Sequence, residues 1–534
     1  MPLKINNFAG TTAMIKLAFK RDRIIVPIFV LFMVLIIVGT AATFADLYSD
    51  APVRNALYLQ MQNNYSYVAL LGSILDPSVG GLTAWRIGIG GSIIIGLINI
   101  FLIIRHTRSE ERKGRLELLY SASVGRQAAL TSALITSFGV NLIVTLITVL
   151  GLIGLGLEAT SPIVFALSIG LFGCLISSIT AVAVQLTESS GDARYLTIGL
   201  LIGFYMLRIV GWDSGNVTWI SWLSPFGWVH YTRPFAGNDL WVLGIFLIFI
   251  TGLTITAYWL SSIRDVGSGI ITQRPGPARA SKILKSSLAL AWRLHRGMLI
   301  FWVLIFVLMG ALMGFTAQSV NELISSNPQF LQLITQIANS NPVDSYFTFV
   351  FAFLGIVFAV YAILATSKLW SQESQKYSEM LLTNSVSRSK WAISNLIFAV
   401  LGPAFVIILF SLALGLAYGF SSGNISIDLT RIVVASLAYL PAVWILTGIT
   451  MLLFGLVPRL TSLSWAALGL FLLVDLLGEF LDFDEWILNL SPFTHVPKLL
   501  AGDIVNTSLG WLFILAAVLI IVGVMGYRRR DIMG

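Results

Sequence analysis

The sequence predicts an all-α polytopic membrane protein with twelve transmembrane helices. Of its 534 residues, 57% are hydrophobic and 11% are charged, whereas about 25% of the residues in an ordinary soluble domain are charged. A chain of this size cannot cover a water-exposed surface with so few polar groups, so its solvent is lipid. At about 20 residues per helix, the apolar residues supply on the order of a dozen spans.

Twelve apolar runs predict these spans in order, each of about 17 residues or more. The first six are Ile24–Ala45, Thr83–Ile104, Ala129–Leu157, Ile163–Leu186, Tyr195–Val210 and Leu240–Ser261. The second six are Met298–Ser319, Tyr346–Leu369, Trp391–Phe420, Ile432–Leu456, Ser462–Phe480 and Gly510–Tyr527. The first run is longer than the apolar core of a signal peptide, so we count it as a span. An even number of spans places both termini on one side.

The charged residues orient the chain. One side collects 27 of the 33 lysine and arginine residues and 10 of the 25 acids, a net charge of +17, and the other side carries −9. By the positive-inside rule, the basic side is cytoplasmic and holds both termini. The net charge of +8 therefore reflects orientation in the membrane, and we expect no nucleic-acid partner.

Few residues are available for catalysis or metal binding. Cys174 is the single cysteine, which excludes a disulfide within the chain and a multi-cysteine metal site, and its apolar neighbours indicate a packed thiol. The four histidines show no HExxH or HxxxH spacing, and no phosphate-binding loop of the form GxxxxGKS/T occurs. We therefore expect no catalytic site, metal or cofactor in this chain, so another subunit must bind any ATP that it uses.

The chain contains an internal duplication. Residues Ser109–Arg126 align without gaps with Ser371–Arg388, at an offset of 262 residues, and seven of the 18 positions are identical. Shorter matches join Leu17–Lys20 to Leu290–Arg293, Leu223–Phe226 to Leu490–Phe493, and Arg264–Asp265 to Arg530–Asp531. We expect a first six-helix half at 1–272, a second at 273–534 and a linker rich in Pro and Gly at about 264–281. Because six is even, the two halves share one orientation and form a parallel repeat.

The loop after the second span has a helical start that the second half repeats. Ser109 caps a predicted helix whose first turn carries Glu110 and Glu111, where acids oppose the helix dipole. Glu111 and Arg115 are spaced to pair at i and i+4. A solvated hairpin that keeps positive charge inside is the simpler alternative. Topology alone needs no acids, however, so the repeated pattern favours docking to a cytoplasmic partner.

Five motifs along the chain carry a family resemblance. They are RHTRSEERKGRLELL (Arg105–Leu119), SPFGWVHYTRPFAGNDLW (Ser224–Trp241), RDVGSGIITQRPGPARA (Arg264–Ala280), LSPFTHVPKLLAGD (Leu490–Asp503) and RRRDI (Arg528–Ile532). The chain resembles, over essentially its whole length, bacterial ABC-type exporter permeases of the polyketide-antibiotic class and is similar to tetronasin-resistance permeases. In that family the second coupling segment usually looks like EEAAGRAEPLL, whereas this chain has ESQKYSEMLL, without the Gly-Arg pair.

The resemblance implies a permease that exports hydrophobic compounds, namely antibiotics of the polyketide or ionophore class, across the bacterial plasma membrane. It implies a separate ABC ATPase subunit, in two copies, which binds ATP and Mg. It also implies an ABCG-like (type V exporter) arrangement with amphipathic helices before each half, at Asn7–Arg23 and Lys282–Arg296. Coupling to the ATPase falls on Glu110, Glu111, Arg115, Glu117, Arg126, Glu373, Glu379 and Arg388. Outer re-entrant elements fall on Ser224, Pro225, Phe226, Ser491, Pro492 and Phe493.

Two charges lie inside predicted spans. Arg208 and Asp475 each stand 15 residues before their copy of Leu-Ser-Pro-Phe, so the duplication places them at equivalent positions. Ionisable groups inside a membrane usually pair or face a water-filled cavity. We hypothesise that Arg208 faces Asp475, or Glu479 one turn later, as a gate or latch. The alternative is that Arg208 snorkels to the outer interface.

Aromatic side chains offer a weaker prediction of the substrate cavity. Phe204 and Tyr205 are the candidates for substrate contact. Phe347, Phe349, Phe351 and Phe353 alternate, so they cannot all face one cavity from a helix. Gly88, Gly90, Gly91 and Gly96 lie inside a span with no preceding strand, which indicates helix packing rather than a dinucleotide site.

Other functions stay open at this point. A secondary, ion-coupled drug transporter also has two six-helix halves, although the long acidic loop argues against it and no carboxylate or histidine at the membrane centre suggests a proton relay. An ABC exporter of a lipid or peptide is a further alternative, because apolar pockets discriminate weakly. A membrane-embedded enzyme would need a cluster of His, Asp and Glu that the sequence does not provide.

Overall fold

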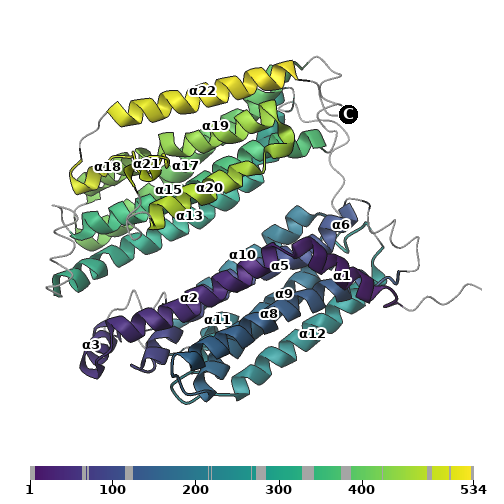
Figure 1. The fold of residues 1–534 in the computed structure, drawn as a ribbon, viewed down its shortest axis with the longest axis vertical. Coiled ribbons are helices and arrows are strands. Elements are labelled where there is room, and N and C mark those ends of the chain that lie inside the picture. The colour runs from purple at the N-terminus through teal and green to yellow at the C-terminus, as the bar shows by residue number, and fades with distance from the viewer. Residues whose placement is uncertain are drawn as a thin grey trace, which may run out of the picture. The chain divides into compact units, whose positions relative to one another are not determined.

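The fold is known from a computed structural model of the chain. The structure describes residues 7–62, 68, 71–112, 114, 124–213, 216–217, 219–265, 267–271, 284, 286–326, 342–374, 386–423, 425–477, 484–503 and 507–530. The chain divides into two compact units, Met1–Pro275 and Gly276–Gly534, each a bundle of long helices (Figure 1). The predicted boundary at residue 272 and most of the predicted linker at 264–281 lie outside the described residues.

The first unit is built around one deeply buried helix. Its elements are α1 (Thr11–Asp22), α2 (Ile25–Leu47), α3 (Ala51–Gln62), α5 (Val79–His106), α6 (Arg108–Arg112), α8 (Ala128–Gly154), α9 (Thr160–Leu186), α10 (Ser190–Val210), β1 (Trp212–Asp213), β2 (Asn216–Val217), η1 (Trp219–Leu223), α11 (Pro225–Tyr231) and α12 (Trp241–Ile263). Helix α9 packs against α5, α8 and α12. The strands β1 and β2 form a two-residue antiparallel pair after α10.

The second unit has one large hydrophobic core. Its elements are α13 (Ser287–Ser326), α15 (Pro342–Ser374), α17 (Arg388–Ser422), α18 (Ile425–Leu437), α19 (Leu440–Leu456), η3 (Pro458–Leu460), α20 (Leu463–Leu477), α21 (Glu485–Leu488), η4 (Leu499–Ala501) and α22 (Thr507–Arg529). Helix α13 packs along α17, α22 packs along α19, and α15 contacts both α17 and α19.

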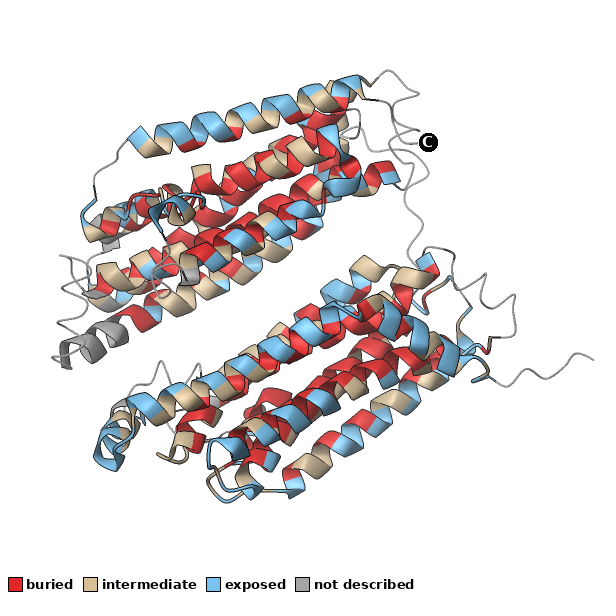
Figure 2. Ribbon diagram, viewed as in Figure 1, coloured by how far each residue is buried: buried red, intermediate tan, exposed pale blue. Residues whose placement is uncertain are grey.

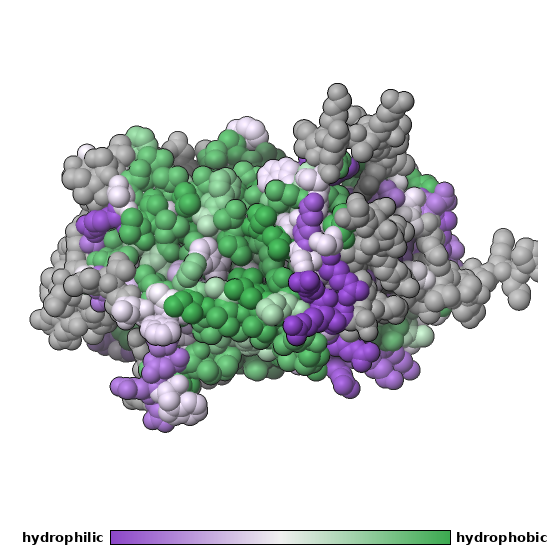
Figure 3. Space-filling view, turned by 90° about the horizontal axis from the view of Figure 1, so that it is seen from above, coloured by the Kyte–Doolittle hydropathy of each residue, from purple (hydrophilic) through white to green (hydrophobic). Residues whose placement is uncertain are grey.

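Helix length and composition identify a multi-pass membrane protein. Eleven helices in the described part of the chain are long and apolar enough to cross a membrane, when the adjoining α18 and α19 are taken together as Leu429–Leu456. They coincide with eleven of the twelve predicted spans. Exposed residues along α2, α12 and α22 are mostly large and apolar (Figure 2). Figure 3 shows hydrophobic side chains over the middle of one face and hydrophilic ones gathered toward its ends. This pattern suits a lipid environment.

Two predicted spans differ from the structure. The run Ser462–Phe480 corresponds to α20, of 15 residues, which rises only about 22 Å against a hydrocarbon core of about 30 Å. Residues 478–483, which follow it, lie outside the described residues. The run Ile432–Leu456 is divided between α18 and α19, because Pro441 stands in the first turn of α19 and has no N–H to continue the preceding helix.

The amphipathic segments also differ between the halves. In the first, α1 is a separate helix, and the turn at Arg23–Ile24 divides it from α2. In the second, the segment predicted at Lys282–Arg296 enters α13, which continues without a break from Ser287 to Ser326. The first half therefore has a distinct helix before its span, and the described part of the second does not.

The alternating phenylalanines divide between two environments, as a helix requires. Phe347 and Phe351 are 1% and 2% exposed and pack in the core, whereas Phe349 and Phe353 are 67% and 42% exposed. The prediction that they cannot share one cavity is confirmed.

Candidate functional site

A buried polar cluster of the first unit lies where the 109–126 loop begins. The loop starts as α6, whose first turn carries Glu110 and Glu111 as predicted. The helix begins at Arg108, one residue before the expected cap, because the amides of Glu110 and Glu111 bond to the carbonyl of Thr107. Arg115 and Glu117 lie outside the described residues.

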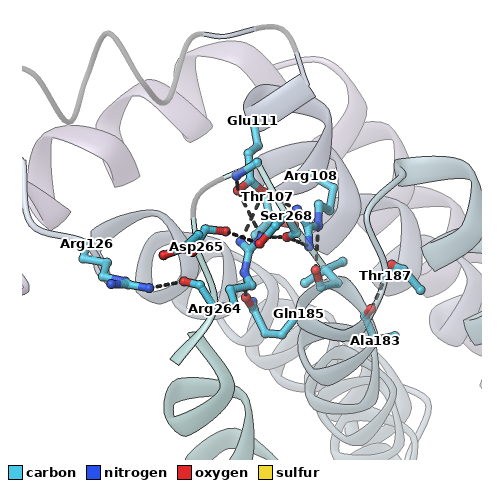
Figure 4. Close-up of polar contacts among 12 residues, drawn as sticks. Thr107, Arg108, Glu111, Arg126, Ala183, Gln185, Thr187, Arg264, Asp265 and Ser268 are labelled. Atoms are coloured by element: carbon cyan, nitrogen blue, oxygen red, sulfur yellow. Dashed lines mark hydrogen bonds and ion pairs between the residues drawn. The ribbon is translucent and has the colours of Figure 1, made fainter. Parts of the chain in front are cut away.

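Glu111 holds the centre of this cluster (Figure 4). Its side chain is 4% exposed, and Oε1 lies 3.0 Å from Nη1 of Arg264. Oε2 accepts hydrogen bonds from Nη1 of Arg108 at 2.9 Å and from Nη2 of Arg264 at 3.1 Å. The amide of Gly267 donates to Oε1 at 2.8 Å. A buried carboxylate with two guanidinium partners and a backbone donor is fully compensated.

Arg264 connects this loop to two other elements. From the end of α12, its Nε donates to Oε1 of Gln185, on α9, at 2.6 Å. Its carbonyl oxygen accepts a hydrogen bond from Nη2 of Arg126, at the far end of the loop, and Nε of Arg126 donates to the carbonyl of Ser261 at 3.1 Å. Figure 4 shows these contacts converging from several segments. Both ends of the loop thus meet at one residue.

Arg108 was not among the predicted site residues, yet it is nearly inaccessible, with a side chain 2% exposed. Its Nε donates to the carbonyl of Val184 at 2.6 Å and its Nη2 to the carbonyl of Ser268 at 2.7 Å. Arg108 directly precedes the repeated segment Ser109–Arg126, and because it lies outside the aligned residues the duplication did not predict a role for it.

The second unit repeats the central contacts. Nη2 of Arg530 lies 2.5 Å from Oε2 of Glu373, and these side chains are 14% and 5% exposed, against 13% and 4% for Arg264 and Glu111. Nη1 of Arg388 donates to the carbonyl of Arg530 at 2.6 Å. The Arg530 guanidinium stacks over Phe454, 4.9 Å from the ring centre. Glu379 lies outside the described residues.

We name these two sets the first clamp (Glu111, Arg126 and Arg264) and the second clamp (Glu373, Arg388 and Arg530). The sequence predicted Glu111, Arg126, Glu373 and Arg388 as loop residues. It also matched Arg264–Asp265 to Arg530–Asp531, but it did not predict that these arginines contact the loops.

The first unit has a second buried acid, whose partners lie close in the chain to the first clamp. Asp22 is fully buried at the end of α1, 2.9 Å from Nη2 of Arg105 and 2.5 Å from Nε2 of His106. Its aligned position in the second unit holds His295, whose Nε2 lies 3.1 Å from Oδ1 of Asn395. Around the first clamp, the described residues therefore form more ion pairs than those around the second.

At the other end of the first unit, the predicted outer and cavity residues meet. Oγ of Ser224 donates to the carbonyl of Phe204 at 2.6 Å, and the rings of Tyr205 and Phe226 lie 5.7 Å apart. Pro225 begins α11. The Arg208 side chain is fully buried in this unit rather than at its surface, and a Cβ on Gly72 would lie 2.6 Å from its Nη2.

His230, on α11, belongs to the same region. Its Nε2 lies 3.5 Å from Oγ of Ser73. Burial, with the nearby charges of Arg208 and Arg233, lowers the pKa of His230 from its ordinary 6.5 to about 3. The imidazole is therefore neutral at physiological pH. It lines a cavity with Trp85 and Phe165.

The corresponding residues of the second unit are also brought together. Ser491 and Phe493 are buried, as is Pro492 between them, and Asp475 is hydrogen-bonded to Ser491. Glu479 lies outside the described residues. Arg208 belongs to the first unit and Asp475 to the second, so their pairing stays a prediction.

No group of three or more His, Cys, Asp or Glu side chains that could hold a metal ion occurs among the described residues. In the first clamp, both carboxylate oxygens of Glu111 have protein partners, whereas in the second clamp Oε1 of Glu373 and Nε of Arg530 have no hydrogen-bond partner among the described residues. The chemistry of both clamps is suited to holding segments together rather than to catalysis.

Comparison with known proteins places this architecture in a family. A family model described as "Multidrug efflux system permease Rv1217c, C-terminal domain" matches residues 79–259 and 284–528. The chain is 35% identical over 533 residues to the multidrug efflux system permease protein Rv1217c of Mycobacterium tuberculosis, covering 99% of this chain and 97% of that protein. The matched residues contain most of the membrane-crossing helices and the loop residues of both clamps, and they end just before Arg264 and Arg530. The chain therefore belongs to the Rv1217c family of multidrug efflux system permeases.

Proposed function

We propose that this chain is the transmembrane permease subunit of an ATP-driven exporter of hydrophobic compounds. Its family makes it a permease for drug efflux. The observation that best supports ATP coupling is the recurrence, in both units, of a buried glutamate–arginine pair at the start of the loop after the second span. A loop that only kept positive charge inside would not need a buried acid tied to a distant helix end.

The proposed assembly has a separate ABC ATPase in two copies, one for each loop. ATP and Mg bind to that subunit. The permease has twelve spans in two parallel six-helix halves, 1–272 and 273–534, in an ABCG-like (type V) arrangement, with α20 completing the second half. Both termini face the cytoplasm of a bacterial cell, in its plasma membrane. Arg208 with Asp475 or Glu479 forms the outer gate.

The proposed substrates are antibiotics of the polyketide or ionophore class, similar to those of tetronasin-resistance permeases. Phe204 and Tyr205 lie beside the outer element, Phe204 through its backbone carbonyl and Tyr205 through its ring, and aromatic side chains of this kind supply the surface that large hydrophobic molecules bind. Lipid or peptide export is distinguished by offering those substrates in the same assay.

The test is transport by the chain purified together with an ABC ATPase subunit from the same organism and reconstituted into proteoliposomes. We expect uptake of a fluorescent ionophore to need ATP and to stop when the phosphate-binding lysine of the ATPase is replaced by alanine. An uncoupler should leave the initial rate unchanged. Transport that an uncoupler abolishes and that survives ATPase inactivation would instead identify a secondary transporter.

A further inference from the structure

We propose that Arg264 and Arg530 are positioning residues that join the loop between the second and third spans to the last helix of each unit, so that a movement of the loop is transmitted to that helix. This proposal rests on the proposed function, since it assigns the path by which an ATPase acting on the loop moves the permease. It concerns contacts within each unit.

The geometry gives each arginine three attachments. Its guanidinium holds the glutamate at the start of the loop, at 3.0 Å for Arg264 and 2.5 Å for Arg530. Its carbonyl accepts from the arginine at the end of the loop, Arg126 or Arg388. Its guanidinium also contacts the fourth helix of the bundle, through a hydrogen bond to Gln185 in the first unit and by stacking on a ring in the second. The loop is therefore closed onto one residue at the end of α12 or α22.

The two clamps keep these contacts although their spacing in the chain differs. Glu111 and Arg264 are 153 residues apart, whereas Glu373 and Arg530 are 157 apart. The intervening segment has thus changed in length while the ion pair stayed, at nearly equal exposure in both units. Solvent-exposed ion pairs contribute little to the stability of a protein. A buried ion pair is different, because the loss of one partner leaves the other charge buried and lowers stability. Its retention at both sites favours a role shared by both loops.

The helices that carry the arginines are suited to move. The apolar window of α12 is 22% buried and that of α22 is 17% buried, the lowest values among the membrane-crossing helices of their units. Displacing such a helix breaks fewer packed contacts than displacing a central helix such as α9, whose window is 72% buried. Because breaking the buried ion pair is costly, a displaced loop carries the end of the last helix with it.

The two clamps should differ in how strongly the loss of their arginine affects transport. Glu111 keeps Arg108 at 2.9 Å when Arg264 is replaced, whereas the position aligned with Arg108 in the second unit is Trp370, which is 44% exposed. Arg530→Gln should therefore uncouple transport more strongly than Arg264→Gln.

The experiment measures ATP hydrolysis and substrate export in the same proteoliposomes, using the full complex with its ATPase. We expect Arg530→Gln to lower export per ATP hydrolysed by about tenfold, within the usual range of coupling between sites, while ATP hydrolysis stays within about twofold of the unmodified complex. Arg528→Gln, on the exposed side of the same helix end, is the matched control and should change neither. The charge-swapped pair Glu373→Arg with Arg530→Glu should recover export that each single change loses.

An unchanged ratio of export to hydrolysis in Arg530→Gln would overturn the proposal. If that variant does not assemble with the ATPase, the charge-swapped pair decides the question: an assembled complex that hydrolyses ATP but exports no better than the single changes contradicts it. An unmodified complex without ATP-dependent export would count against the proposed function instead, so the two failures are distinguishable.

Discussion

Replacing Asn99 by leucine should destabilise the first unit strongly. Asn99 is fully buried on α5 and exchanges hydrogen bonds of 2.9 and 3.1 Å with the amide of Asn141 on α8. Its Oδ1 also accepts from Ser137 and, at 2.9 Å, from Ser177 on α9. Three helices are thus joined by one side chain. Gly173 allows the approach, because a Cβ there would lie 2.7 Å from Oδ1 of Asn141.

The cost of the change follows from these contacts. Hydrogen bonds between membrane helices average about 0.6 kcal/mol, so the four interhelical bonds of Asn99 contribute about 2.4 kcal/mol. Leaving the buried amide of Asn141 without the hydrogen bonds that it exchanges with Asn99 adds about 1 to 3 kcal/mol. Leucine has a similar volume, so little cavity energy is expected. We therefore predict a loss of about 3 to 5 kcal/mol in the free energy of unfolding.

The assay is reversible unfolding of the purified chain in bicelles, followed by tryptophan fluorescence. Thr256→Val is the matched control, because the exposed Thr256 hydroxyl bonds only to the carbonyl of Gly252 within its own helix. The control should change the free energy of unfolding by less than about 0.5 kcal/mol. A cost below about 1 kcal/mol for Asn99→Leu would refute the reasoning, since it would mean that the three helices do not depend on this side chain.

Three further predictions concern packing and protonation. Gly523→Ala should separate α22 from α19 and lower thermal stability, because its Cβ would lie 2.6 Å from the Met451 carbonyl group, whereas Gly510→Ala on the same helix meets nothing within 4 Å; equal melting temperatures would contradict this. Phe347→Ala should lower the free energy of unfolding by about 3 to 5 kcal/mol. Phe349→Ala should lower it much less, because the Phe349 side chain is 67% exposed; equal losses for the two variants would contradict the core position of Phe347. The pKa of His230 is lowered to about 3 in the folded chain, so the imidazole of the unfolded chain takes up a proton first as the pH falls below about 6.5. The free energy of unfolding should therefore decrease toward acid, by up to about 1.4 kcal/mol per pH unit. His230→Gln should flatten that decrease when unfolding is measured between about pH 4 and 7.

Much of the fold could be predicted because hydropathy reports directly on lipid exposure. Most membrane-crossing helices follow from apolar runs bounded by charge. The break before Pro441 and the short α20 were harder, because both lie inside continuous apolar sequence. Hydropathy alone cannot distinguish one long helix from two shorter ones.

The site could be predicted only in its parts. The duplication indicated which loop residues to select, and it matched Arg264–Asp265 to Arg530–Asp531. It could not show that Glu111 pairs with an arginine 153 residues away, since local spacing favoured Arg115 at i+4. Long-range ion pairs depend on which helix ends meet in space, and a single sequence does not show which ends those are.

The spacing within each clamp also sets an order of events during synthesis. Glu111 leaves the ribosome close to Arg108, so a cation of the same short segment is at hand long before Arg264 is made. Glu373 has Trp370 at the aligned place, and Arg530 follows 157 residues later. The contact between Glu373 and Arg530 can form only after the intervening helices of the second unit have been made, so it joins residues that leave the ribosome far apart in time.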